Sequence, residues 1–181
     1  MTKYMSATVK REGKRNLLIA GPRAKTGRED RTMGIEIEFF GVHRNTAVNA
    51  LRNAGIDVAW EGYTHRTARH WKLVYDSSVT AQGTGIGFGL ELVSPPLNET
   101  EMTRQLKIVC KVLDQIGAKV DRTCGLHVHH HIDDFTVSNV KNIYKLYEKH
   151  QLAIEAILPK SRRGAMNPRY CKGIDRAVMR R

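Results

Sequence analysis

Apolar and polar side chains alternate along residues 33–40, in the order Met-Gly-Ile-Glu-Ile-Glu-Phe-Phe. This period of two predicts a β-strand that places its isoleucines on one face and Glu36 and Glu38 on the other. Two carboxylates on one strand face repel each other, and divalent cations bound by both would relieve that repulsion. A half-exposed strand with an ordinary polar face accounts for the same alternation. The pattern alone therefore leaves both interpretations open.

The rest of the chain shows period-two alternation and the wider apolar spacing of amphipathic helices. These patterns predict helices over 45–54, 98–116 and 136–158, and strands over 16–20, 33–40, 56–60, 71–76, 86–93, 119–124 and 126–132. Asn98 and Glu101 form a capping-box pattern at the start of the second helix, and Thr136 opens the third. This order favours an α+β domain, with an antiparallel sheet and helices on one of its faces.

The composition is that of a globular protein with one hydrophobic core. The chain has 181 residues, of which 41% are hydrophobic and 27% are charged, and this suits a single domain. No apolar run reaches the roughly 18 residues that span a bilayer, and residues 1–15 contain no apolar signal region. Cys110, Cys124 and Cys171 form no paired framework. We therefore expect reduced thiols and a cytoplasmic protein that does not enter a membrane.

The net charge of +12 is concentrated at the two ends of the chain. Residues 1–31 carry nine Lys and Arg against three acidic residues, and residues 159–181 carry eight against one. The middle, residues 32–158, carries thirteen against fourteen. Basic ends suit phosphates, acidic substrates or nucleic acid. Solvated termini without a partner explain them equally well.

Three further predicted strands carry polar residues that could take part in chemistry. Asp76 follows an apolar run, where it also suits a turn. Glu91 lies inside an apolar strand, where an unpaired carboxylate is costly unless it faces solvent. His127, His129 and His131 share one face of the last strand, and imidazole is a common metal ligand. Histidines alone would suit Zn²⁺, whereas mixed carboxylate and histidine ligands would suit Mg²⁺ or Mn²⁺.

The order of these segments, GIEIEF, WKLVYDSSV, ELVSPPL, a helix and CGLHVHH, resembles the amidoligase family of carboxylate–amine ligases. That family belongs to the wider superfamily of glutamine synthetase and glutamate–cysteine ligase. The resemblance covers residues 33–172, including 158–163 and 169–171 after the long helix. It implies a catalytic domain over 31–172 like that of glutamine synthetase, with a curved antiparallel sheet. A basic segment, 1–30, precedes this domain, and a basic tail, 173–181, follows it.

The resemblance implies that ATP phosphorylates a carboxylate and that an amine then attacks the acyl phosphate, with two or three Mg²⁺ ions, or Mn²⁺, in the site. By position, the metal ligands are Glu36, Glu38, Glu91 and His127, the nucleotide contacts are His127, His129 and Arg162, and the residues beside the reacting groups are Asp76, Arg162 and Arg163. These roles agree with the chemistry of the residues, because cations and arginines neutralise a phosphoryl group in transfer. A surface rich in Lys and Arg would suit a glutamyl or peptide acid.

The chain departs from the family pattern at its C-terminal end. The family usually continues beyond the Arg-x-Tyr-Cys segment with a late strand that carries Glu-x-Arg. Three explanations are open: a shortened core, a strand supplied by a partner or a second copy at the exposed sheet edge, or the loss of catalysis. We therefore expect a homo-oligomer or a partner chain.

Two other functions compete with a ligase. One is a catalytically inactive protein that binds nucleic acid or a protein partner through its basic ends, with strong salt dependence. The other is a metal hydrolase built on the three histidines, although neither HExxH nor CxxC accompanies them. The ordered set of carboxylates and histidines favours the ligase.

Overall fold

The computed structural model describes residues 31–62, 64, 66–80, 89–164, 171, 173 and 174. They belong to two compact units that divide after His131, and each unit is treated by itself below. Several predicted features lie outside the described residues: the basic segment 1–30 with its strand over 16–20, the first residues of the strand over 86–93, Arg169 and Tyr170, and most of the basic tail.

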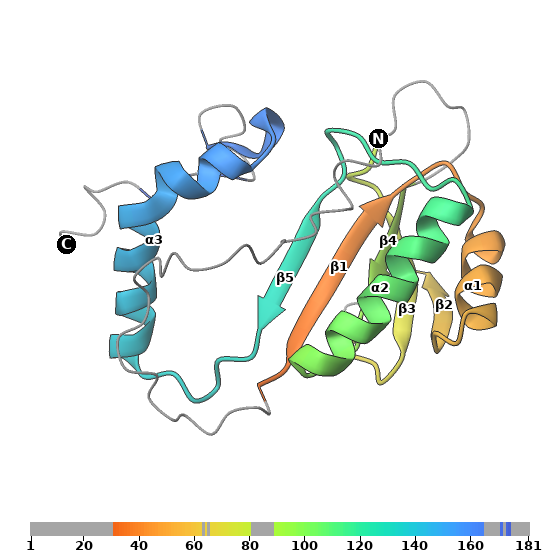
Figure 1. The fold of residues 1–181 in the computed structure, drawn as a ribbon, viewed down its shortest axis with the longest axis horizontal. Coiled ribbons are helices and arrows are strands. Elements are labelled where there is room, and N and C mark those ends of the chain that lie inside the picture. Colours follow the sequence, from red (N-terminus) through yellow and green to blue (C-terminus); the bar gives the residue numbers. More distant parts are fainter. Residues whose placement is uncertain are drawn as a thin grey trace, which may run out of the picture. The chain divides into compact units, whose positions relative to one another are not determined.

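The first unit contains a five-stranded sheet and two helices, which makes it an α+β unit as the sequence predicts (Figure 1). Its strands are β1 (Met33–Phe39), β2 (Val58–Gly62), β3 (Trp71–Asp76), β4 (Gly89–Val93) and β5 (Leu126–His130), and its helices are α1 (Arg44–Asn53) and α2 (Glu99–Gln115). The strand order is β2-β3-β4-β1-β5. β1 thus lies between β4 and β5, so its glutamates have neighbours on both sides.

The sheet is mixed, and the prediction of a wholly antiparallel sheet was wrong for one pair. β2 and β3 run parallel, because the chain crosses back between them and the amide of Trp71 donates to the carbonyl of Asp57 (2.8 Å). The Lys72 ammonium donates to the carbonyl of Arg66 (2.6 Å) and lies 3.5 Å from that of Thr64, which ties down the returning segment. The other three pairs are antiparallel.

The strand predicted over 119–124 does not form in the described chain. Lys119 makes only an isolated bridge with Phe40, through two backbone hydrogen bonds of 2.8 and 2.9 Å. The chain then turns, because Asp121 Oδ1 accepts hydrogen bonds from the amide (2.7 Å) and hydroxyl (2.6 Å) of Thr123. An aspartate that bonds the backbone two residues ahead favours a turn over a strand. This turn delivers the chain to the start of β5.

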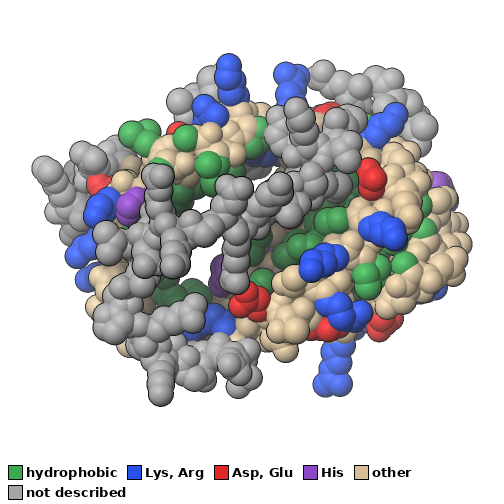
Figure 2. Space-filling view, viewed as in Figure 1, with side chains coloured by type: hydrophobic (Ala, Val, Ile, Leu, Met, Phe, Trp, Pro, Cys, Tyr) green, Lys and Arg blue, Asp and Glu red, His purple; other side chains and the backbone are tan. Residues whose placement is uncertain are grey.

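The alternation along β1 separates the two faces of the sheet. Ile35, Ile37 and Phe39 are buried, and α1 and α2 pack over this apolar face (Figure 1). The helices contribute a core of Ala47, Val48, Leu51, Met102, Val109, Val112 and Leu113. Figure 2 shows Lys and Arg side chains interspersed with acidic ones over the outer surface of these helices. Glu36 and Glu38 therefore lie on the opposite face, which we call the acidic face.

The second unit contains α3 (Val137–Ile157) and a short 3-10 helix, η1 (Lys160–Arg162). α3 begins at a capping box, in which Thr136 and Asn139 exchange side-chain and backbone hydrogen bonds. The guanidinium of Arg163 donates to the carbonyls of Leu158 (3.0 and 3.1 Å) and Ala156 (3.4 Å), which satisfies acceptors at the end of α3.

The structure bears on two expectations from the sequence, the reduced thiols and the lack of a membrane-spanning segment. The three cysteines, Cys110, Cys124 and Cys171, form no disulfide. Among the described residues, none of the helices combines the length and the apolar character that a membrane span requires. The cytoplasmic location itself stays a prediction, as does the expected partner chain or second copy.

Candidate metal centre

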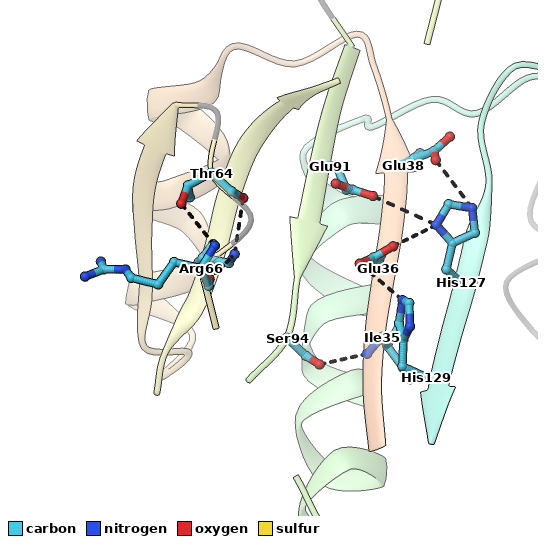
Figure 3. Close-up of polar contacts among 10 residues, drawn as sticks. Ile35, Glu36, Glu38, Thr64, Arg66, Glu91, Ser94, His127 and His129 are labelled. Atoms are coloured by element: carbon cyan, nitrogen blue, oxygen red, sulfur yellow. Dashed lines mark hydrogen bonds and ion pairs between the residues drawn. The ribbon is translucent and has the colours of Figure 1, made fainter. Parts of the chain in front are cut away.

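The strand register brings the predicted carboxylates and histidines together on the acidic face (Figure 3). Glu38 of β1 lies opposite Glu91 of β4, and Glu36 of β1 lies opposite His127 of β5. Residues directly opposite in an antiparallel pair point to the same face. His129 lies one step further along β5, opposite Gly34. Three strands therefore converge on one cluster of titratable side chains.

Glu36 is held between two histidines. His127 Nδ1 lies 2.8 Å from Glu36 Oε2, and His129 Nε2 lies 3.2 Å from Glu36 Oε1. The His127 ring also approaches the other two glutamates, with Nε2 3.7 Å from Glu38 Oε1 and Nδ1 4.0 Å from Glu91 Oε1. His127 is thus the one imidazole of β5 within 4 Å of all three carboxylates in the described chain.

Glu38 is the most buried carboxylate of the cluster, with only 5% of its surface exposed. Its Oε2 accepts a hydrogen bond of 2.5 Å from the amide of Gly125. Asp76 enters the cluster from the end of β3, and its Oδ1 also accepts a hydrogen bond from the amide of Ser78 (2.7 Å). Asp76 therefore makes the predicted turn contact and also lies in the cluster, while its role in a reaction stays a prediction.

Two groups of three side chains have donor atoms close enough to share an ion. One is Glu36, Glu91 and His127, and the other is Glu38, Asp76 and Glu91; within each, the donor atoms lie within 4.8 Å of one another. Glu91 belongs to both. Carboxylate oxygens are the donors that Mg²⁺ prefers, and adding an imidazole also suits Mn²⁺. The donor set therefore fits a pair of hard divalent cations.

The pKa values of the two central glutamates, Glu36 and Glu91, are shifted in opposite directions. Burial, followed by the neighbouring carboxylates Glu36, Asp76 and Glu38, raises the pKa of Glu91 to about 7, and His127 offsets this only in part. Burial alone would raise the pKa of Glu36, but hydrogen bonds from His127 and His129 outweigh it and lower the pKa below its usual value. The positive charge near Glu91 thus does not balance the negative charge of the surrounding carboxylates. Bound cations would supply the missing positive charge.

The folded state of the ion-free protein should therefore become less stable as the pH rises, because Glu91 ionises in an unfavourable environment. The folded-state pKa of about 7 lies above the ordinary value of 4.5. The contribution of protonated Glu91 is fully present below pH 4.5 and is lost as the pH rises through 7. In EDTA at pH 8, we expect Glu91→Gln to melt roughly 2–4 °C above the wild type, the effect of about 1 kcal/mol once solvent screening is allowed for. The gain should vanish at pH 5. If the variant and the wild type melt at the same temperature at pH 8 as well as at pH 5, the raised pKa of Glu91 is contradicted.

The structure gathers most of the predicted site residues, while their roles stay predictions. Glu36, Glu38, Glu91, His127 and Asp76 form the two groups, and His129 contacts Glu36. β5 ends at His130, so His131 lies beyond the strand, where its amide donates to the Thr32 carbonyl (3.0 Å). Arg162 and Arg163 belong to the second unit.

Sequence reasoning missed two residues that shape the acidic face. Gly125 contacts Glu38 through its backbone, and buried Lys72 fixes the segment that returns to β3. The position of this glycine, directly before the histidine-rich strand, could have pointed to it in the sequence. A lysine inside an apolar strand was also visible, but the pattern gives no partner for it.

The fold and the cluster define a class of protein, an α+β domain whose sheet carries acidic groups that could hold a metal ion on the face opposite α1 and α2. The family described as "Putative amidoligase enzyme" matches residues 29–181. The chain belongs to the amidoligase family, as the resemblance indicated. No curated protein and no solved structure matches it.

Proposed function

We propose that this chain is a ligase that uses ATP and Mg²⁺ to join a carboxylate to an amine through an acyl phosphate. Its membership of the amidoligase family supports the reaction class. The observation that carries the proposal is the pair of candidate cation groups that share Glu91. An architecture like the catalytic domain of glutamine synthetase would suit this arrangement, since the family resemblance implies a sheet that holds its Mg²⁺ ions on one face.

The residues of the acidic face have separate roles in this proposal. Glu36, Glu91 and His127 would hold one ion, and Glu38, Asp76 and Glu91 a second. Bound cations would neutralise charge on the phosphates. His129, which is 3.2 Å from Glu36 Oε1, would orient that carboxylate and contact the nucleotide. The predicted phosphate contacts of Arg162 and Arg163 remain part of this hypothesis.

The reaction proceeds in two balanced steps. A carboxylate oxygen of the substrate attacks the γ-phosphorus of ATP, the bond from that phosphorus to the β,γ-bridging oxygen breaks, and ADP leaves. The amine then attacks the acyl carbon, the bond to the phosphate oxygen breaks, and inorganic phosphate leaves while the amine nitrogen loses a proton. Neither step forms a covalent bond to the protein, so positioning and fixed charge carry the rate. A glutamyl or peptide acid is the proposed carboxylate class.

Trapping the acyl phosphate tests this function. The protein is incubated with ATP, Mg²⁺ and a panel of glutamyl and peptide acids, with hydroxylamine in place of the amine. We expect ATP-dependent hydroxamate for at least one acid, and loss of it in Glu36→Gln. The matched control is Glu99→Gln, an exposed glutamate in the first turn of α2. No hydroxamate and no ADP with any acid would contradict the proposal.

A further inference from the structure

Gly125 lies directly before β5 and against Glu38. The amide of Gly125 donates to Glu38 Oε2 (2.5 Å), and the amide of Glu38 donates to the carbonyl of Gly125 (3.1 Å). One residue therefore holds both the backbone and the carboxylate of Glu38. A buried carboxylate fixed in this way loses the freedom to rotate away from its neighbours.

There is too little space beside Gly125 for a side chain. A Cβ atom built there would lie 2.8 Å from His127 Nε2 and 3.1 Å from Glu38 Oε1. Contacts under 3.0 Å force something to move, and here the nearest atoms belong to two proposed metal ligands. Gly125 does not adopt the left-handed conformation, so alanine would be compatible with its backbone. A methyl group would act on the ligands and would not strain the chain.

We infer that Gly125 is a positioning residue of the metal centre. Its amide fixes Glu38 Oε2, and its missing side chain lets the His127 ring and Glu38 Oε1 approach to 3.7 Å. Because Oε2 is engaged by the backbone, Glu38 presents Oε1 to the ion as a single donor. The small, near-octahedral shell of Mg²⁺ favours such single donors, whereas Ca²⁺ readily accepts bidentate carboxylates. This inference rests on the proposed metal centre and assigns a residue that touches no ion itself.

Gly34 offers a matched control for Gly125. It lies on β1 opposite His129, and its backbone is not left-handed either. A Cβ there would meet His129 Cβ at 3.8 Å and Ser94 Oγ at 3.9 Å, which are ordinary contacts. Gly34→Ala and Gly125→Ala thus add the same methyl group to neighbouring strands, with space for it at only one of them.

The test is calorimetric titration of the ion-free proteins with Mn²⁺ alone. We expect Gly125→Ala to weaken Mn²⁺ binding by about tenfold or more, as the loss of groups that orient metal ligands does. Gly34→Ala should bind as the wild type does. We also expect a lower ratio of Mn²⁺ to Ca²⁺ affinity in Gly125→Ala, a readout that a merely structural role would leave unchanged. Unaltered Mn²⁺ binding in Gly125→Ala would overturn the inference alone, whereas no Mn²⁺ binding in the wild type would also contradict the metal centre.

A second pair of variants covers the case in which circular dichroism shows that Gly125→Ala does not fold. Gly125→Ala combined with His127→Ala removes the 2.8 Å contact and keeps the 3.1 Å contact with Glu38. Compared with His127→Ala alone, the double variant should still bind Mn²⁺ more weakly. Equal Mn²⁺ binding within the His127→Ala pair would overturn the inference.

Discussion

Replacing Glu91 by glutamine is expected to abolish the binding of both cations at once, with at least about a hundredfold loss of affinity for each. The reason is that Glu91 belongs to both candidate groups, while the other members belong to one each. An amide keeps the size of the side chain but removes the negative charge that a hard cation requires. Titration of the ion-free protein with Mn²⁺ measures both the affinity and the number of ions.

Two single variants serve as controls for that result. Glu36→Gln should remove the ion of one group and Asp76→Asn the ion of the other, so each should bind one ion where the wild type binds two. This stoichiometry follows from the geometry of the acidic face and does not depend on the substrate. A single ion in the wild type, or two ions retained in Glu91→Gln, would contradict the shared centre.

Cation affinity should fall about tenfold when the pH is lowered from 8 to 6. Burial and the surrounding carboxylates raise the pKa of Glu91 to about 7 in the ion-free protein. At pH 6 most molecules therefore carry a proton on Glu91, and an ion must displace it before it binds. At pH 8 the carboxylate is already charged. Calorimetry in two buffers of different ionisation enthalpy, near pH 7, should detect release of a proton upon binding.

The control for this pH dependence is a residue with the opposite shift. Hydrogen bonds from His127 and His129 lower the pKa of Glu36, so Glu36 stays charged across the same range. Glu36→Gln should therefore weaken binding while keeping a smaller decline between pH 8 and 6, because burial still raises the pKa of Glu91 when the charge of Glu36 is removed. Affinity that is constant over this range in both the wild type and Glu36→Gln would show that Glu91 does not compete with a proton.

The sequence predicted the acidic face because strand alternation is a local property. Glu36 and Glu38 share a face of β1 by the pleat alone, and His127 and His129 share a face of β5 for the same reason. The α2 helix was equally accessible, because Asn98 accepts a hydrogen bond from the amide of Glu101 (2.9 Å) as predicted. Only this half of the predicted capping box forms, since the Glu101 carboxylate accepts hydrogen bonds from Arg104 and Gln105. Chemistry that follows from neighbours in the chain could be predicted before the fold was known.

The pairing of strands could not be predicted in the same way. Alternation along β2 and β3 is the same whether they run parallel or antiparallel, so the parallel pair was missed. The opposition of Glu38 and Glu91 likewise depends on the register between β1 and β4, which no local pattern fixes. The shared role of Glu91 and the contact of Gly125 with Glu38 both arise from this long-range register.

The α3 helix shows a different limit. Its amphipathic spacing predicted a helix over 136–158. The helix is present, yet none of its residues is buried, and the apolar side chains of Ile143, Tyr144 and Tyr147 are at least 37% exposed. Periodicity predicts which face of a helix is apolar, but the surface that covers that face is a property of tertiary packing.

ATP binding measured by calorimetry, with and without Mg²⁺, tests the central claim most directly. The wild type and the double variant Glu36→Ala with Glu38→Ala would be compared under the same conditions. The account predicts micromolar binding of ATP by the wild type that requires Mg²⁺ and is lost in the double variant. ATP binding that is absent from the wild type, or that is equal in the two proteins, would contradict it.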